Sequence, residues 1–281
     1  MWKRFLLIAL LVSALSGAAA AQELDVDRYN INVQIDAAAN KLQAQAVLSL
    51  SNPADASKPR IFLSVSKKAK VSQVTVDSSP AQYEVTDDTR FNGLYRITIT
   101  PSSPMAPGGH ATVSVAYTLD AADTTPLLAI YPGEVLLMPE SVWYPAPSNI
   151  FAIYGPNTAP FDLTVRATGV DGDFKFASAG AASGGTGSFA YSSNLNSVPF
   201  LVGGDFASPE TSEQGGIKIE AYVQPGLASA SGAPVEAEAA GSSGGTGSGG
   251  GTASEQVARI QKETGRIVDF MTRLLGPAPS G

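Results

Sequence analysis

Strict alternation of apolar and polar side chains limits what this chain can fold into more than any other feature. Over Tyr29–Ile35 every second residue is apolar, and the three residues between them carry amides. The same period recurs over Leu42–Leu50, after a turn at Asn40-Lys41. Successive side chains of a strand point to opposite faces, so each segment predicts a strand with one buried and one solvent-facing side. Together the two segments and the turn predict a β-hairpin.

Further segments of strand character continue to about residue 225. They lie at Ile61–Val65, Val71–Val76, Tyr95–Thr100, Ala111–Tyr117, Phe161–Ala167, Phe174–Phe176, Phe189–Ser192 and Ile217–Val223. Turn-forming pairs such as Asn92-Gly93 and Asp171-Gly172 separate them. No long helical period occurs before residue 250. The pattern predicts a mainly β fold, either a sandwich or an open antiparallel sheet with a saddle shape, and of these we expect an antiparallel, saddle-like β-sandwich.

Two other polar stretches have the composition of turns. Gly184–Gly187 is glycine-rich and predicts a hairpin loop, and the adjacent carboxylates of Asp87 and Asp88 predict a solvated turn.

The first 21 residues have the three parts of a secretory signal. Lys3 and Arg4 precede an apolar run over Phe5–Leu15, and small residues ending at Ala21 follow it. The apolar run is shorter than the roughly 20 residues that a membrane-spanning helix needs. We therefore expect residues 1–21 to be a signal peptide and the mature protein to be secreted or periplasmic, with no membrane contact after cleavage.

Charge and cysteine content exclude several classes of function. The formal net charge is −7, which argues against non-specific binding to nucleic acid. The chain contains no cysteine, so disulfides, thiolate nucleophiles and cysteine-ligated zinc are all excluded. A hydrophobic core must hold the mature domain, residues 22–225, together.

The amino-acid composition changes after residue 225. Residues 226–251 consist mostly of Ala, Ser, Gly and Glu, which predicts a flexible Gly/Ser linker. In residues 252–281, Thr252 and Glu255 form a capping box, and apolar residues then recur every three or four positions up to Gly276. This pattern predicts one amphipathic helix. Such a helix needs a packing partner, which is either the β domain or, as we favour, a second domain that the helix begins.

The order of several short motifs resembles one enzyme family. The motifs are Tyr29–Asp36, Val142–Pro145, Phe161–Val165, Ala177–Gly180, Gly203–Phe206, Ile219–Gly226 and Leu275–Pro279. Their series, over residues 24–281, resembles the N-terminal β domain and first catalytic-domain helix of the M1-family (gluzincin) zinc aminopeptidases. The resemblance implies a saddle-shaped β domain that caps a thermolysin-like catalytic domain, with 252–281 as the first helix of a truncated catalytic domain.

The zinc motif of that family is absent from this chain. Hydrolysis of this kind needs His-Glu-x-x-His, which places two imidazoles on one metal ion while the Glu activates water. The only histidine is His110, which we interpret as a solvated turn residue. We expect no metal ligands, no catalytic residues and no cofactor in this chain; zinc is expected only in a full-length relative.

The resemblance also implies a substrate-binding role for part of the β domain. In the family, a Gln or Glu of this domain holds the free amino group of the peptide substrate. The segment 136–145 offers Glu140, with Tyr144 as a pocket-lining residue, although Glu140 lies closer to Pro145 than the family pattern has it and the intervening Arg is missing. An exposed loop carboxylate at Glu140, and core packing of Trp143 and Tyr144, remain the structural alternatives.

Two functions follow. The first is the substrate-capping domain of an exported M1-like zinc aminopeptidase, catalytically incomplete in this chain, whose partners would be the missing catalytic domain and the N-terminus of a peptide substrate. The alternative is a non-catalytic exported β-sandwich that serves binding or adhesion.

Overall fold

The structure is a computed structural model that describes residues 24–147, 157–185, 187–206, 210–214 and 217–221, with residues 258, 261–262 and 264–267 near the C-terminus. The predicted signal peptide (1–21) and linker (226–251) lie outside these residues. Among the residues that are described, no helix combines the length and apolar character needed to cross a membrane.

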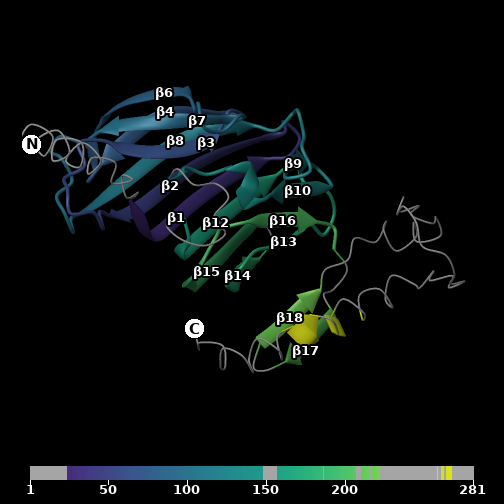
Figure 1. The fold of residues 1–281 in the computed structure, drawn as a ribbon. Coiled ribbons are helices and arrows are strands. Elements are labelled where there is room, and N and C mark those ends of the chain that lie inside the picture. Colours follow the sequence, from purple (N-terminus) through teal and green to yellow (C-terminus); the bar gives the residue numbers. More distant parts are fainter. Residues whose placement is uncertain are drawn as a thin grey trace, which may run out of the picture.

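One large twisted sheet forms the body of the domain (Figure 1). Its eight strands lie in the order β14-β15-β12-β1-β2-β8-β4-β5. Their bounds are β1 (Asp25–Asp36), β2 (Lys41–Ser51), β4 (Ala69–Val76), β5 (Ser79–Pro80), β8 (His110–Asp120), β12 (Ala159–Thr168), β14 (Ala181–Gly185) and β15 (Ser188–Ser197).

The predicted hairpin is the central pair of this sheet. β1 and β2 are antiparallel, with Ile31 opposite Ala46 and Gln34 opposite Gln43. Asn40 closes the connection with a φ of 55°, a left-handed conformation that Asn tolerates better than most residues. Its side-chain Nδ2 donates a hydrogen bond to the carbonyl of Ile130 at 2.6 Å, which ties the turn to a second sheet.

Two four-stranded sheets pack with the large sheet. One has the order β13-β16-β10-β9, from β13 (Lys175–Ala177), β16 (Leu201–Gly204), β10 (Glu134–Leu137) and β9 (Leu128–Tyr131). The other has the order β11-β3-β7-β6, from β11 (Ala146–Pro147), β3 (Ile61–Ser66), β7 (Leu94–Thr100) and β6 (Gln82–Asp87).

A single hydrophobic core joins these three sheets. Alternate residues of β1, including Tyr29, Ile31 and Val33, are buried, and the residues between them are exposed. The same cluster contains Ile97 of β7 and Leu201 of β16. One face of the large sheet is therefore covered by both smaller sheets, and the other face, which carries the amides, meets solvent.

The fold class agrees with the prediction: the protein is mainly β, with antiparallel sheets. The predicted segments up to residue 192 all contain strands, with bounds shifted by a few residues. The hairpin predicted around Gly184–Gly187 is formed by β14 and β15, but Gly184 and Gly185 are the last residues of β14, so the connection is shorter than predicted; φ is 99° at Gly184 and 76° at Gly187.

One strand pair is parallel, which alternation could not reveal. β1 runs alongside β12 with Tyr29 opposite Phe161 and Gln34 opposite Arg166. Parallel neighbours require a long connection, and here the chain builds β2 to β11 between them.

The solvent exposure predicted for Asp87 and Asp88 is correct only for Asp87, which is the last residue of strand β6 rather than part of a turn. The side chain of Asp87 is 70% exposed and pairs with Lys67 at 2.6 Å. Asp88 is 5% exposed, because it turns inward to accept hydrogen bonds from Arg90, Arg96 and Ser64. Its solvation was therefore predicted wrongly.

The last described elements are a hairpin and part of the C-terminal helix. β17 (Glu210–Gln214) pairs with β18 (Ile217–Ala221) as a two-stranded sheet. Residues 258, 261–262 and 264–267 are helical, as the amphipathic pattern predicted, and Ile267 is 63% exposed.

Candidate functional site

Glu140 lies in a tight turn that directly follows β10. Pro139–Ser141 forms a single 3-10 turn (η2), whose Ser141 hydroxyl donates to the carbonyl of Met138 at 2.7 Å. The Glu140 side chain is exposed. Val142 ends the turn in a left-handed conformation (φ 49°, ψ 46°), which is strained for a β-branched residue. Strain of this kind concentrates at functional sites, so this turn is a candidate for binding.

Aromatic side chains form a buried cluster beneath the turn. Tyr144 packs edge-to-face on Tyr29 (ring centroids 5.4 Å apart) and on Trp143 (4.9 Å). The Tyr29 hydroxyl donates to the carbonyl of Asn157 at 3.2 Å. Burial, followed by the charge of Glu140, raises the pKa of Tyr144 well above its usual value.

The structure thus brings Glu140 and Tyr144 together, with different exposures. Tyr144 is 3% exposed and Trp143 is fully buried, the core packing that was the alternative for these aromatics. A direct contact of Tyr144 with substrate stays a prediction. The indole N–H of Trp143 and the hydroxyl of Tyr117 are buried and have no hydrogen-bond partner in the described part of the chain.

The donor set of this chain does not fit a catalytic zinc ion. His110 begins β8, and its Nδ1 lies 3.1 Å from a carboxylate oxygen of Asp27, with both side chains well exposed. Within the described residues, no three His, Cys, Asp or Glu side chains gather where they could hold a metal ion. A second imidazole would have to come from outside this sequence, so we derive no step through zinc here.

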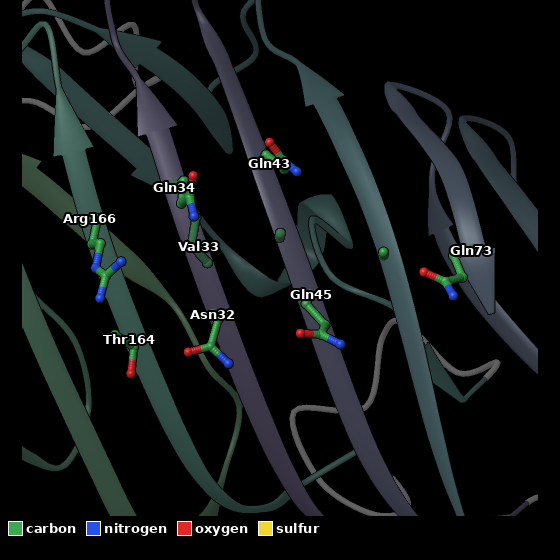
Figure 2. A pocket seen from close by; sticks show the side chains of 10 residues that line it. Asn32, Val33, Gln34, Gln43, Gln45, Gln73, Thr164 and Arg166 are labelled. Carbon is green, nitrogen blue, oxygen red and sulfur yellow. The ribbon is translucent and has the colours of Figure 1, made fainter. Parts of the chain in front are cut away.

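A shallow hollow of about 400 Å³ lies on the solvent-facing side of the large sheet. Figure 2 shows its side chains on neighbouring strands, with Arg166 and Thr164 on β12, Asn32 and Gln34 on β1, and Gln43 and Gln45 on β2. Gln73 of β4 completes the polar lining on the far side of β8. We call this hollow, lined by Asn32, Gln34, Gln43, Gln45, Gln73, Thr164 and Arg166, the amide groove.

The sequence alone did not predict the amide groove, although some of the polar residues that line it stand out in the alternating pattern. The alternation over Tyr29–Ile35 places three amide side chains on the solvent-facing side of a strand. Contact with water alone explains polar residues at such positions, so they gave no indication of a binding site. What brings Gln43, Gln73 and Arg166 beside them is strand order and register, including the parallel β1–β12 pair.

Solved structures with the same fold are M1 zinc metallopeptidases. A mutant of the enzyme from Deinococcus radiodurans, bound to a Tyr-Ser-Ala substrate, superposes with a TM-score of 0.56 at 16% sequence identity. A two-domain M1 zinc metallopeptidase mutant bound to L-tryptophan gives 0.57 at 17% identity. Each match covers 92% of this chain and 55% of the other.

These matches establish the fold. The chain spans 55% of the length of these two M1 structures. No protein-family model and no curated protein sequence matches the chain.

Proposed function

We propose that this chain is the N-terminal, substrate-capping domain of an exported M1-like zinc aminopeptidase. The observation that carries the proposal is the shared fold, which extends over 92% of this chain but only 55% of the M1 structures. The remaining part of such an enzyme would supply the zinc ligands, which fits the single histidine and the lack of cysteine here. By itself the chain is catalytically incomplete.

Within this proposal each part of the chain has a role. Residues 1–21 direct export to the periplasm or the medium, and residues 22–225 form the cap. The low-complexity composition of residues 226–251 supports a linker role, and residues 252–281 would begin the catalytic domain. The amphipathic pattern of that last segment, with Ile267 exposed, supports a helix whose packing partner is a further domain.

Glu140 is the residue that we assign to the substrate. A peptide N-terminus is an ammonium group at neutral pH, and a carboxylate is its natural partner. Glu140 is exposed on a strained turn, and the buried aromatic residues Trp143 and Tyr144 follow that turn directly in the chain. Tyr144 would either contact the substrate, as the resemblance implies, or keep the Glu140 side chain in position.

The product of the complete reading frame tests both parts of the proposal. We expect it to contain a His-Glu-x-x-His segment, to bind one zinc ion and to hydrolyse an amino-acid anilide. Glu140→Ala should lower kcat/KM about 10- to 100-fold, mainly through KM, because a charge-assisted hydrogen bond to the substrate is lost. Glu134→Ala, which removes an exposed carboxylate from β10, is the matched control and should stay within twofold.

The outcomes separate the two claims. Equal kinetics for Glu140→Ala and Glu134→Ala would remove Glu140 from the site and leave the domain assignment intact. A complete product without zinc and without hydrolysis would overturn the aminopeptidase assignment. The alternative would then hold, a non-catalytic exported binding or adhesion module, which the amide groove favours.

A further inference from the structure

The amide groove differs in charge character from the rest of the protein. The chain carries 25 acidic and 18 basic residues, yet none of the residues that line the groove is acidic. Its polar side chains are five carboxamides, one hydroxyl and the guanidinium of Arg166. The surface is therefore nearly neutral and rich in hydrogen-bonding groups.

Most of this hydrogen-bonding capacity is unused within the described residues. Asn32 donates to Asn30 at 3.1 Å, and Gln45 donates to the hydroxyl of Ser114 at 3.0 Å. Gln34, Gln43 and Gln73 make no side-chain hydrogen bond in the described part of the chain, and Arg166 has no ion pair there. Each carboxamide offers two donors and one acceptor oxygen with two lone pairs.

The strand register arranges these groups in rows across the sheet. Thr164, Asn32, Gln45 and Ala116 lie opposite one another on β12, β1, β2 and β8, and Gln73 follows on β4. Neighbouring strands are about 4.8 Å apart, so the row is about 19 Å long. Arg166, Gln34 and Gln43 form a second row beside it. Such an extended surface suits a chain-like ligand.

The floor of the groove offers no apolar anchor. Val33 and Ala44 contribute to the lining, but their side chains are buried on the opposite face of the sheet. Ala116 adds a small, half-buried methyl group. Protein partners bind mainly through large apolar or aromatic anchors seated in pockets, which the described lining lacks. A ligand whose surface consists of hydroxyl groups fits better than a peptide.

From these observations we propose that the amide groove binds a neutral, hydroxyl-rich oligosaccharide. A sugar hydroxyl is both a donor and an acceptor, so pairs of hydroxyls match carboxamides, while Arg166 donates to hydroxyl and ring oxygens. Strand faces of other β folds bind oligosaccharides. The net charge of −7 disfavours a polyanion. This binding is independent of the proposed peptidase role.

Affinity electrophoresis of the chain in gels containing dextran, arabinoxylan or glucomannan tests the proposal. We expect at least one of these neutral polymers to retard the protein, with the same apparent Kd in 0.15 and 0.5 M NaCl, because no ion pair is involved. Gln34→Ala/Gln43→Ala should weaken retardation about tenfold, through the loss of two hydrogen-bonding side chains.

Gln82→Ala is the matched control, since it removes an exposed amide from β6, in another sheet. It should leave retardation unchanged, and circular dichroism should give the same melting curve for all three proteins. The proposal is overturned if no neutral polymer retards the protein or if the double variant binds normally. Salt-sensitive retardation by polygalacturonate alone, or binding only to a denatured protein such as casein, would equally overturn it.

Discussion

Asp88 is a carboxylate that the fold keeps charged while removing it from water. Burial by itself raises its pKa, but hydrogen bonds from the Arg90 side chain and backbone, and the charges of Arg90 and Arg96, outweigh burial and lower the pKa to about 2. Arg90 Nη2 lies 3.0 Å from one carboxylate oxygen, and Arg96 Nη2 lies 3.4 Å from the other. The group thus stabilises the folded state when it is ionised.

Replacement of this carboxylate should destabilise the domain. Asp88→Asn leaves Arg96 partly buried without its counter-charge, so we expect a loss of about 1–3 kcal/mol in the free energy of unfolding at pH 7. Urea denaturation measures this loss in the free energy of unfolding. Asp87→Asn, at the 70% exposed neighbour, should change stability by less than about 0.5 kcal/mol. Equal effects of the two substitutions would contradict the Asp88 network.

The low pKa of Asp88 predicts that the stability of the domain depends on pH. Its folded pKa of about 2 lies below the unfolded value near 3.9, so its contribution is complete above about pH 5 and is lost as the pH falls toward 2. The difference in Tm between the wild type and Asp88→Asn should shrink over that interval. A difference that stays constant from pH 5 to pH 2 would argue against a charged Asp88.

Residues of this kind mark the limit of what the sequence could predict. Asp87 and Asp88 are identical and adjacent, yet Asp87 ends strand β6 with an exposed side chain and Asp88, the next residue, is buried against its hydrogen-bond partners. Arg96 reaches Asp88 from β7, so the network requires the pairing of β6 with β7. Glu140 and Tyr144, by contrast, were assigned together from the resemblance, and their role in substrate binding stays a prediction.

Among the elements, β16 shows how closely the small sheet packs. Gly203 lies opposite Val135 of β10 and Phe176 of β13. A Cβ at Gly203 would lie 2.5 Å from a ring carbon of Phe174 and 2.6 Å from the ring of Phe176. Those two rings stack edge-to-face with centroids 5.0 Å apart, so neither can move without disturbing the other.

Gly203→Ala should therefore destabilise the domain by about 1–3 kcal/mol, the usual cost of overpacking. Gly133→Ala is the control, since its Cβ would meet only the Asp171 carboxylate at 3.9 Å, and it should stay within about 0.5 kcal/mol. Thermal denaturation of both variants measures the contrast. A neutral Gly203→Ala would contradict the packing around β16.

Among the strands, the sequence predicted the long ones well and the short ones poorly. The period of two is clear over β1, β2, β8 and β12, because each has one buried and one exposed face. Strands such as β9, β14 and β16 are four or five residues long, too short for a period to emerge. Pairing between distant strands, as in β1 with β12, leaves no local signal at all.

For the whole molecule, the mainly β class and the saddle-like sandwich followed from alternation and turn chemistry. The division into a cap and a catalytic part followed from the resemblance and from the missing zinc motif, and it remains a proposal supported by the shared fold. The amide groove depends on the order of five strands, so only the folded sheet brings it into view.

The central claim is that this chain is a cap that needs further protein to become an enzyme. The most direct measurement compares residues 1–281 with the product of the complete reading frame, for zinc content and for hydrolysis of an amino-acid anilide in the presence of zinc. We predict that the complete product binds one zinc ion and cleaves the anilide, and that residues 1–281 do neither. Stoichiometric zinc and hydrolysis by residues 1–281 alone would contradict the account.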